Sequence, residues 1–414
     1  MRKHLSKVSK SAALLHLDRL ERDLPNGALF EQRFDSVAYE FDDTSVLEDV
    51  YQGRTKFFGY GRQGSPTTSA LENRISHLED GIGSLVFSSG MAAYDSVYST
   101  IARSGDHIIA SRYLFSNTLS LLESYKSRWG LEVDYVDPTE IENVASCLKS
   151  NTIAVLVETV SNPTTIVPCM HAIGDFCEVN NIAFIVDNTV TGPLAFSPKA
   201  AKASLVIHSL TKGISGHGRS LGGSVTDTGC YDWLNGKIIL EDSCIDSNGF
   251  LYLKQLRKKG RSEKGSMPSN HEIAQISMGM ETLPLRSTQS ASTANKLAEM
   301  LSLNPNIDRV WYPGLDTHDQ HEYCKEHFAN FGALLSFSLN GKKPGEFLDR
   351  LSLIVTSSSL GDTRTLAIPP ATTIFHDISR ESRELMDIPD GMIRMSVGIE
   401  PPGDLISDIE QALS

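Results

Sequence analysis

The run SLVIHSLTKG, residues 204–213, joins an apolar stretch of strand length to two hydroxyls and one amine. Ser209, Thr211 and Lys212 follow the apolar residues, and Gly213 interrupts the pattern. Glycine permits close backbone approach, and hydroxyl and backbone N–H groups bind phosphate. This stretch can therefore present one amine to a ligand whose anionic group lies nearby. The alternative is that Lys212 is an ordinary solvated surface charge.

Asp187 lies near the end of a second apolar run, FIVDN, at residues 184–188. An amine for a Schiff base and a carboxylate for a pyridinium nitrogen are the two groups that a pyridoxal phosphate (PLP) enzyme has to supply. A nearby carboxylate favours the protonated form of that nitrogen and so raises its pKa. We therefore predict PLP as the cofactor. For Asp187 taken alone, the alternative is a helix N-cap.

Apolar runs of strand length alternate with helical patterns between residues 69 and 208. This alternation predicts βαβ units and a mostly parallel central sheet in an α/β protein. Ligands of such sheets bind outside the carboxyl ends of the strands. The sequence therefore predicts one pocket lined by the residues that follow the strands, namely Ser88–Met91, Phe115, Asn162, Asp187 and Lys212.

Three segments are expected along the chain. Residues 1–65 carry many charges and weak periodicity, which predicts an N-terminal arm. Residues 66–275 form the predicted large PLP-binding domain, and residues 276–414 form a predicted smaller C-terminal α+β domain. The stretch 225–275 is polar and contains several Lys and Arg residues, so we expect it to be an exposed crossover.

The composition limits the classes of function. The chain has 414 residues, of which 40% are hydrophobic and 21% charged, as in soluble globular proteins with more than one domain. Its net charge of −13 argues against nucleic-acid binding. No apolar run is long enough to cross a bilayer, and none follows the basic N-terminus, so neither a membrane span nor a signal peptide is expected. The six cysteines lack Cys-x-x-Cys spacing, so we predict reduced thiols, no metal site and a cytoplasmic location.

Three further motifs allow both a functional and a structural interpretation. The serines before Gly90 and Met91 open a predicted helix whose first N–H groups can bind an anion, although a serine cap explains them equally well. Arg394 lies in an apolar strand pattern and needs an anionic partner, either in a salt bridge or in a substrate carboxylate. Tyr60 and Arg62 lie in a loop, which is also consistent with a plain turn.

Six stretches carry a resemblance to a known family. They are YGR at 60–62, FSSGMA at 87–92, SNP at 161–163, VDNT at 186–189, HSLTK at 208–212 and IRMSVG at 393–398. Together and in this order they resemble the Cys/Met-metabolism family of PLP enzymes, within the fold-type I aminotransferase-like group. That family includes cystathionine γ-synthase, cystathionine lyases, methionine γ-lyase and the O-acyl-homoserine sulfhydrylases. The resemblance extends from about Gly59 to the C-terminus.

The resemblance implies a role for each matched residue. Lys212 would bond to the aldehyde of PLP and later act as the base at the substrate Cα, and Asp187 would face the ring nitrogen. The substrate carboxylate would be bound by Ser359 and Arg394. The other implied contacts are with the cofactor phosphate (Ser89, Gly90, Met91, Ser209, Thr211), with its phenolic oxygen (Asn162) and with the phosphate of a neighbouring subunit's site (Tyr60, Arg62). The arm would then contact a second subunit, which implies at least a homodimer and suggests a homotetramer.

One departure from the family pattern bears on the reaction. Phe115 stands where many relatives have a tyrosine over the cofactor ring, and phenylalanine can stack there but cannot exchange a proton. In this respect the chain resembles O-succinylhomoserine sulfhydrylases. Against this, the segment ATTIF at 371–375 lacks a histidine that many relatives have, and Ser116 replaces a common glycine.

We therefore expect γ-replacement on an O-acyl-homoserine, preferably the O-succinyl ester, in sulfur amino-acid metabolism. Sulfide or cysteine would be the second substrate, and Lys212 and Phe115 the catalytic residues. The alternative is a PLP-dependent carbon–sulfur lyase that acts on cystathionine or methionine. A third possibility is a cofactor-binding protein without turnover. The presence of Lys212, Asp187 and Arg394 together argues against it.

Overall fold

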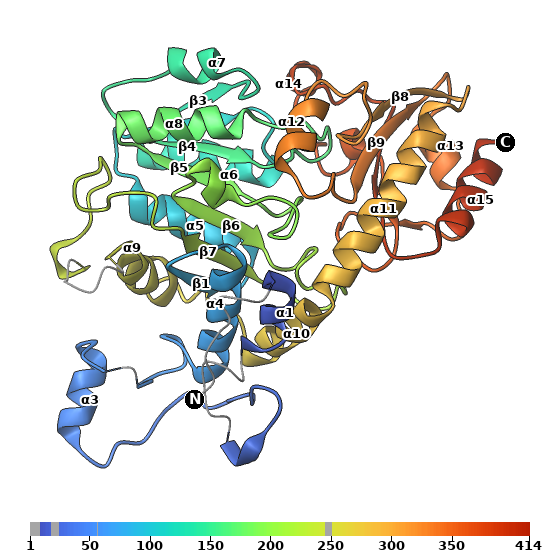
Figure 1. Ribbon diagram of the computed structural model, residues 1–414. Coiled ribbons are helices and arrows are strands. Elements are labelled where there is room, and N and C mark those ends of the chain that lie inside the picture. Colours follow the sequence, from blue (N-terminus) through green and yellow to red (C-terminus); the bar gives the residue numbers. More distant parts are fainter. Residues whose placement is uncertain (1–8, 18–24, 56, 245–250) are drawn as a thin grey trace.

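Two β-sheets organise the protein. The computed structural model describes residues 9–17, 25–55, 57–244 and 251–414. A seven-stranded sheet forms the larger body, and a five-stranded sheet forms the smaller one beside it (Figure 1). The long helix α11 (Leu283–Ser302) runs from the first body to the second.

The first sheet has the strand order β1-β7-β6-β5-β4-β2-β3. Strands β2 to β6 run parallel, and β7 is antiparallel to its neighbours β1 and β6. The predicted mostly parallel central sheet is thus confirmed. Its strands are β1 (Gly83–Phe87), β2 (His107–Ser111), β3 (Glu132–Val136), β4 (Thr152–Glu158), β5 (Ala183–Asp187), β6 (Leu205–Ser209) and β7 (Gly223–Asp227).

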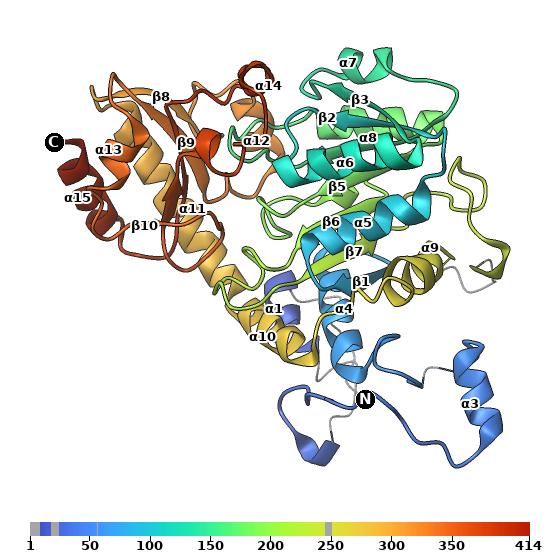
Figure 2. The same ribbon diagram turned by 180° about the vertical axis from the view of Figure 1, so that it is seen from behind.

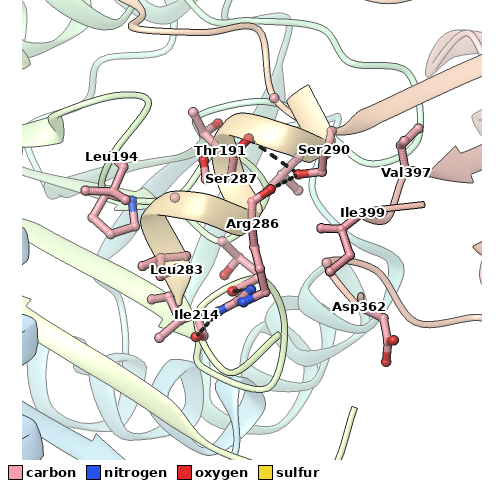
Figure 3. Close-up of a pocket in the computed structure, with 18 residues that line it drawn as sticks. Thr191, Leu194, Ile214, Leu283, Arg286, Ser287, Ser290, Asp362, Val397 and Ile399 are labelled. Carbon is pink, nitrogen blue, oxygen red and sulfur yellow. Dashed lines mark hydrogen bonds between the residues drawn. The ribbon is translucent and has the colours of Figure 1, made fainter. Parts of the chain in front are cut away.

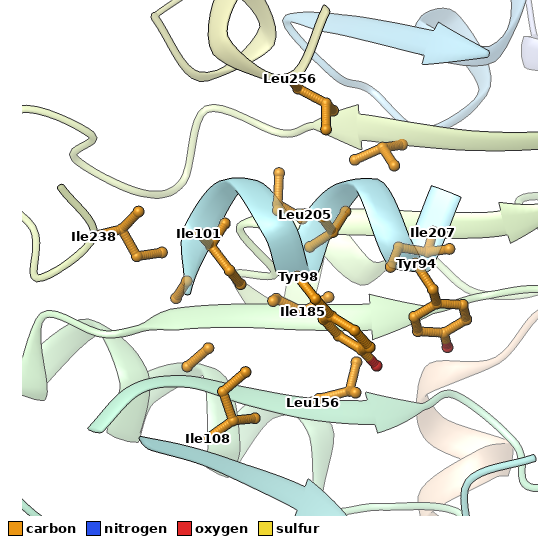
Figure 4. Close-up of a cluster of buried hydrophobic side chains, with 14 of the residues drawn as sticks. Tyr94, Tyr98, Ile101, Ile108, Leu156, Ile185, Leu205, Ile207, Ile238 and Leu256 are labelled. Atoms are coloured by element: carbon orange, nitrogen blue, oxygen red, sulfur yellow. The ribbon is translucent and has the colours of Figure 1, made fainter. Parts of the chain in front are cut away.

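Helices cover both faces of this sheet, and successive side chains along each strand point to opposite faces. One face packs against α5 (Gly90–Ile101) and α6 (Ser116–Trp129), which lie in front of the strands in Figure 2. Leu156, Ile185 and Ile207 belong to this core, beneath Tyr94 and Tyr98 of α5 (Figure 4). The other face packs against α8 (Met170–Asn180).

The same alternation decides where the polar strand ends lie. Two residues beyond Leu156, Ile185 and Ile207, the strands β4, β5 and β6 end in Glu158, Asp187 and Ser209. These three polar residues therefore share the α5 face of the sheet at its carboxyl edge. The first turn of α5 lies at this edge, because Gly90 is packed against Ser209.

The remaining helices of the larger body are α4 (Pro66–Leu78), α7 (Ile141–Ser146), α9 (Leu251–Gln255), α10 (Asn270–Glu281), the 3-10 turns η3 (Pro198–Ala201) and η4 (Asp242–Cys244), and the π-helical η5 (Leu256–Ser262). Serines begin several of them because a serine hydroxyl accepts from an N–H of the first helical turn. Ser65 does this for α4, and Ser269 forms a reciprocal capping box with Glu272 in α10.

The second sheet has the order β10-β11-β12-β9-β8, and only β10 and β11 pair in parallel. Its core packs Phe337 and Met395 against Leu297 of α11 and Leu405 of α15. Its elements are β8 (Ile307–Trp311), α12 (His321–His327), β9 (Leu334–Leu339), α13 (Pro344–Leu348), β10 (Val355–Thr356), β11 (Leu366–Ile368), η6 (Pro370–Thr372), α14 (Arg380–Leu385), β12 (Met392–Ser396) and α15 (Pro402–Leu413).

The N-terminal segment packs against α4 at its start, where Leu14 is buried, and extends away from the larger body around residues 44–51 (Figure 1). It contains α1 (Lys10–Leu14), η2 (Pro25–Gly27) and α3 (Thr44–Tyr51). No side chain of α3 is buried. Several large apolar side chains of this segment are exposed, namely Leu29, Phe30, Val37, Tyr51 and Phe57.

The expectation of an exposed crossover at 225–275 was wrong. Strand β7 enters this stretch, and Leu251, Tyr252 and Leu256 join the core of the first sheet. Arg261 is fully buried and pairs with the carboxylate of Glu72 on α4. A paired arginine can be buried, so the basic composition of the stretch did not indicate its exposure.

The six cysteines all lie in the described ranges, and none of them forms a disulfide there. Within the described ranges, no helix combines the length and apolar character needed to cross a membrane.

Candidate active site

A cavity of about 300 Å³ lies at the carboxyl edge of the first sheet, where segments of the smaller body also reach it. The sequence-predicted residues that line it are Ser89, Gly90, Met91, Phe115, Asn162, Asp187, Ser209, Thr211, Lys212 and Arg394. Residues far apart in the chain meet here because parallel strands place their carboxyl ends at one edge.

Lys212 follows β6 and carries the amine of the cavity. Its Nζ donates a 3.3 Å hydrogen bond to the hydroxyl of Ser359, which lies in the smaller body. Burial lowers the pKa of the Lys212 amine below its usual value, and the positive charge of Arg394 lowers it further. A lowered pKa increases the fraction of neutral amine, which is the nucleophilic and basic form.

Arg286 of α11 forms hydrogen bonds with the backbone that follows Lys212. The Arg286 guanidinium donates to the carbonyls of Gly213 (2.7 Å), Ile214 (3.1 Å) and Gly279 (2.8 Å). A small cavity of about 70 Å³ lies beside this contact, and Figure 3 shows Arg286 reaching from α11 toward Ile214. A Cβ at Gly216 would lie only 1.9 Å from the guanidinium, so the packing there requires glycine.

Asp187 is fixed by two donors. The hydroxyl of Tyr94 donates to its Oδ2 at 2.7 Å, and the backbone N–H of Thr189 donates to its Oδ1 at 2.7 Å. Burial holds the pKa of Tyr94 well above its usual value, and the carboxylate of Asp187 adds to this effect. Tyr94 is therefore a permanent donor to Asp187, which keeps the carboxylate oriented at the cavity wall.

Hydroxyls and backbone N–H groups gather at the start of α5. Ser89 caps the helix by accepting from the N–H of Ala92. A Cβ at Gly90 would lie 2.9 Å from Cβ of Ser209, so glycine is needed for α5 to approach β6 this closely. Thr211 lines the same end, where its hydroxyl accepts from the N–H of Gly222 at 3.0 Å. The helix dipole and these donors favour an anion at this end of the cavity.

Arg394 lies in the centre of the second sheet, on β12 between β9 and β11, and is 1% exposed. Its Nη2 donates to the carbonyls of Ser358 (3.2 Å) and Ser359 (2.7 Å), and its buried Nε has no partner within the described structure. Burial lowers the pKa of the guanidinium to about 10. Among the described residues no carboxylate pairs with Arg394, so the salt-bridge alternative is not what the structure shows.

Phe115 precedes α6 and lines the cavity next to Glu158. Its backbone N–H donates to Glu158 Oε1 at 2.6 Å, and its ring meets the ring of Phe375 edge-on at 6.5 Å. The hydroxyl of the following Ser116 donates to the carbonyl of Ile374. The start of α6 therefore contacts the segment 371–375 of the smaller body through one hydrogen bond and one ring contact.

Tyr60 and Arg62 do not line the cavity of their own chain. Tyr60 forms an isolated β-bridge with Ala38 and is 40% exposed, and the guanidinium of Arg62 lies 5.6 Å from the Tyr60 ring. Arg62 also donates to the carbonyl of Ser262. Ser359 is likewise absent from the lining, although it contacts both Lys212 and Arg394.

The amino-acid sequence matches the Cys/Met metabolism PLP-dependent enzymes over residues 12–414. The chain belongs to this family. The match begins upstream of Gly59, so it includes much of the N-terminal segment that the sequence motifs left out. The predicted family, cofactor and enzyme class are thereby confirmed: the chain is a PLP-dependent transferase or carbon–sulfur lyase.

Relatives with different activities are about equally similar. L-methionine gamma-lyase of Fusobacterium nucleatum subsp. polymorphum is 35% identical over 379 residues, which cover 89% of this chain and 91% of that protein. O-acetyl-L-homoserine sulfhydrylase of Leptospira meyeri is 30% identical over 403 residues, which cover 92% of this chain and 91% of that protein.

Solved structures confirm the fold type. The crystal structure of a protein described as an O-acetylhomoserine (thiol)-lyase (metY) from Campylobacter jejuni subsp. jejuni has a TM-score of 0.91 and 25% sequence identity to this chain. The likeness covers 98% of this chain and 100% of that one, and that protein carries N'-pyridoxyl-lysine-5'-monophosphate.

The residues of the cavity fit the cofactor of this family. The cavity offers one amine at Lys212, one carboxylate with fixed orientation at Asp187, and an anion-binding end at the start of α5. Asn162 Oδ1 is buried without a partner in the described structure, which suits a polar group of a bound ligand. PLP supplies an electron sink for chemistry at the substrate Cα when it is bound.

The rest of the lining was not predicted from the sequence. It consists of Tyr94, Asn117, Thr118, Glu158, Thr189, Val190, Leu221, Ser358 and Leu360. Two of these could have been found. Tyr94 stands four residues after Gly90 and thus on the same helical face. Glu158 directly follows the apolar run 152–157, in the position that Asp187 takes after the next strand.

Proposed function

We propose that this enzyme catalyses γ-replacement on an O-acyl-homoserine, with sulfide or cysteine as the second substrate. The observation that carries the proposal is Phe115, which lines the cavity without a hydroxyl. A phenylalanine ring at this position can stack but cannot exchange a proton with the substrate, whereas a tyrosine could. The similarity to O-acetyl-L-homoserine sulfhydrylase supports the same reaction class.

Each proposed role follows from the chemistry of the side chain. Arg394 binds the α-carboxylate of the substrate through a charge-assisted hydrogen bond, because it is buried and has no carboxylate partner among the described residues. Lys212 removes the proton at Cα as general base, because its lowered pKa favours the neutral amine. Ser359 orients Lys212 through their mutual hydrogen bond. Asp187 faces the ring nitrogen, and the start of α5 binds the phosphate.

The proposal also concerns which acyl group the homoserine substrate carries. The resemblance at Phe115 to O-succinylhomoserine sulfhydrylases favours the O-succinyl ester, whereas the relative from Leptospira meyeri is an O-acetyl-L-homoserine sulfhydrylase. We propose O-succinyl-homoserine as the preferred substrate. O-acetyl-homoserine is the alternative, and the two esters are compared in the same assay.

A carbon–sulfur lyase is the second candidate function. The relative with 35% identity is an L-methionine gamma-lyase, and elimination shares the proton removal at Cα with replacement. In elimination the C–S bond of the substrate breaks, the sulfur leaves as a thiol, and the carbon skeleton takes up water and becomes a 2-oxo acid with release of ammonia. In replacement the product keeps its amino group and gains a new C–S bond.

A substrate panel separates the two functions. O-succinyl- and O-acetyl-homoserine are each incubated with sulfide or cysteine, and cystathionine and methionine are incubated alone, with products identified by mass. Consumption of an ester that depends on the thiol, with homocysteine or cystathionine as product, supports replacement. Release of 2-oxo acid from methionine or cystathionine at a higher kcat/KM than ester replacement would overturn it in favour of the lyase.

We also propose that the active form is at least a homodimer, and by family likeness a homotetramer. Tyr60 and Arg62 lie outside their own cavity, and the N-terminal segment that carries them exposes several apolar side chains. In this proposal both residues reach the phosphate end of the neighbouring subunit's site.

Mixing two inactive variants tests this arrangement. Lys212→Ala lacks the proposed amine and Arg62→Ala lacks the proposed contact from the neighbour. A mixed dimer then contains one site with neither defect and one site with both. Refolding equal amounts of the two variants makes half of the dimers mixed, so it should restore about a quarter of the wild-type activity. Failure to restore activity, when the mixed dimer is shown to form, would contradict the exchange of residues.

We also propose a cytoplasmic location, because cysteines without disulfides suit a reducing compartment.

A further inference from the structure

Glu158 is a second carboxyl group in the cavity, and it lies directly beside Asp187. The two residues are register partners on the neighbouring parallel strands β4 and β5, whose backbones lie about 4.8 Å apart. Both side chains point to the same face of the sheet and line the same cavity. Glu158 is 7% exposed and is not explained by the roles proposed above.

The hydrogen bonds of the two carboxyl groups differ. Asp187 accepts from a donor at each oxygen, namely the Tyr94 hydroxyl and the Thr189 N–H. The Phe115 N–H donates to Oε1 of Glu158 at 2.6 Å, whereas Oε2 of Glu158 is buried without a hydrogen-bond partner in the described structure. Asp187 is thus arranged as a carboxylate, whereas one oxygen of Glu158 lacks any donor.

Burial of Glu158 and the neighbouring Asp187 carboxylate both disfavour a negative charge on Glu158. A single proton is placed on the oxygen that accepts no hydrogen bond, since protonation there displaces no donor. That oxygen is Oε2 of Glu158. Tyr94, Lys212 and Arg394 are the other ionisable groups that line the cavity, and neither amine nor guanidinium forms an ion pair with Glu158 in the described structure.

We propose that Glu158 is a positioning residue that stays an uncharged carboxylic acid at neutral pH, holds the backbone of Phe115, and leaves Asp187 as the only carboxylate charge beside the cofactor ring. Burial raises the pKa of Glu158 well above its usual value, the Asp187 charge raises it further, and the backbone N–H groups of Phe115 and Asn162 oppose the shift. The inference holds for replacement and for elimination alike.

The position of Glu158 explains why a carboxylic acid is useful there. Phe115 belongs to the connection after β2, and Asn162 belongs to the connection after β4, so Glu158 joins two loops that border the cavity. A charged glutamate would add a second negative charge beside the ring nitrogen. An uncharged glutamic acid keeps the hydrogen bond with the Phe115 N–H and adds no negative charge to that of Asp187.

Infrared spectroscopy of the apoprotein at neutral pH tests the protonation state without the reaction. The spectrum of Glu158→Gln is subtracted from that of the wild-type protein. We expect the difference to contain the carbonyl stretch of one protonated carboxylic acid, well separated from the carboxylate bands. The matched control is Glu322→Gln, because Glu322 is exposed on α12 and pairs with Lys325, and its difference spectrum should contain carboxylate bands only. Carboxylate bands for Glu158 as well would overturn the proposal.

The PLP-loaded protein gives a second measurement. If Glu158 is uncharged, Glu158→Gln should keep the pH titration of the visible absorption band and the affinity for PLP within about threefold of wild type, because the amide oxygen still accepts from Phe115. Glu158→Ala should weaken PLP binding by about tenfold or more, because the Phe115 N–H loses its acceptor. A displacement of the band titration by about one pH unit or more in Glu158→Gln would show that a charge had been removed and would overturn the proposal.

Discussion

The ε-amino nitrogen of Lys212 lies 3.3 Å from the hydroxyl oxygen of Ser359, and the carbonyl of the same serine accepts from Arg394 at 2.7 Å. Lys212 belongs to the body built on the first sheet, and Ser359 and Arg394 belong to the body built on the second. The proposed amine and the proposed carboxylate site are therefore connected through one residue. Any change in the relative position of the two bodies alters both groups together.

Lys212→Ala should abolish the yellow colour of the PLP-loaded protein, because no other lysine lines the cavity in the described structure. Borohydride reduction followed by peptide mapping should label Lys212 in the wild-type protein. The control is Lys126→Ala, because Lys126 is exposed on α6 and pairs with Glu123. A label on another lysine, or unchanged colour in Lys212→Ala, would contradict the assignment.

The backbone topology could be predicted because its signals are local. Apolar runs of strand length mark strands β2, β4, β5 and β6, and motif residues mark the loops that follow them. Parallel strands then place Asp187, Asn162 and Lys212 at one edge without further information. The family motifs contributed Arg394, which lies far from this edge in sequence and reaches it through the second sheet.

Other parts of the site depend on contacts that a single sequence does not reveal. Arg286 resembles any helical arginine until its three carbonyl acceptors are seen. Arg261 is buried only because Glu72, 189 residues away, pairs with it. For the same reason, the basic composition of 225–275 predicted an exposed segment, which was wrong.

Arg394→Ala should raise KM for the amino-acid substrate by a factor that corresponds to about 2–4 kcal/mol, because a charge-assisted hydrogen bond to the α-carboxylate is lost. The kcat value should change less than KM. Steady-state kinetics on the accepted substrate checks this. Arg380→Ala is the control, because the Arg380 side chain is 74% exposed on α14. An unchanged KM would remove Arg394 from the substrate site.

Arg286→Lys should destabilise the protein by about 1–3 kcal/mol, because a lysine cannot satisfy three carbonyls in the geometry of the guanidinium. The free energy of unfolding is measured by denaturant titration of the apoprotein. PLP affinity should also fall, since the backbone after Lys212 loses its support. Arg309→Lys is the matched control, because Arg309 is half-exposed and pairs with Asp387 at the surface. Equal stability of the two variants would contradict the supporting role of Arg286.

His318 should make the folded state sensitive to acid. It lies between the two bodies, with Nε2 3.5 Å from the hydroxyl of Thr165 and Nδ1 accepting from the N–H of Gln320. Burial lowers the pKa of His318 from 6.5 to about 4. Between these two pH values the unfolded chain binds a proton that the folded chain does not, so the free energy of unfolding decreases as the pH falls through this window.

The contribution of His318 to the change in the free energy of unfolding with pH is at most about 3 kcal/mol, which is the pKa difference between the folded and unfolded states expressed as free energy. His318→Asn removes the titrating group, so its free energy of unfolding should fall less between pH 7 and pH 4.5 than that of the wild-type protein. Denaturant titrations at several pH values measure this slope. His376→Asn is the control, because His376 is 64% exposed and lies away from the interface with Thr165. If His318→Asn and wild type lose stability in parallel over this window, the imidazole is protonated in the folded state and the interface does not exclude its charge.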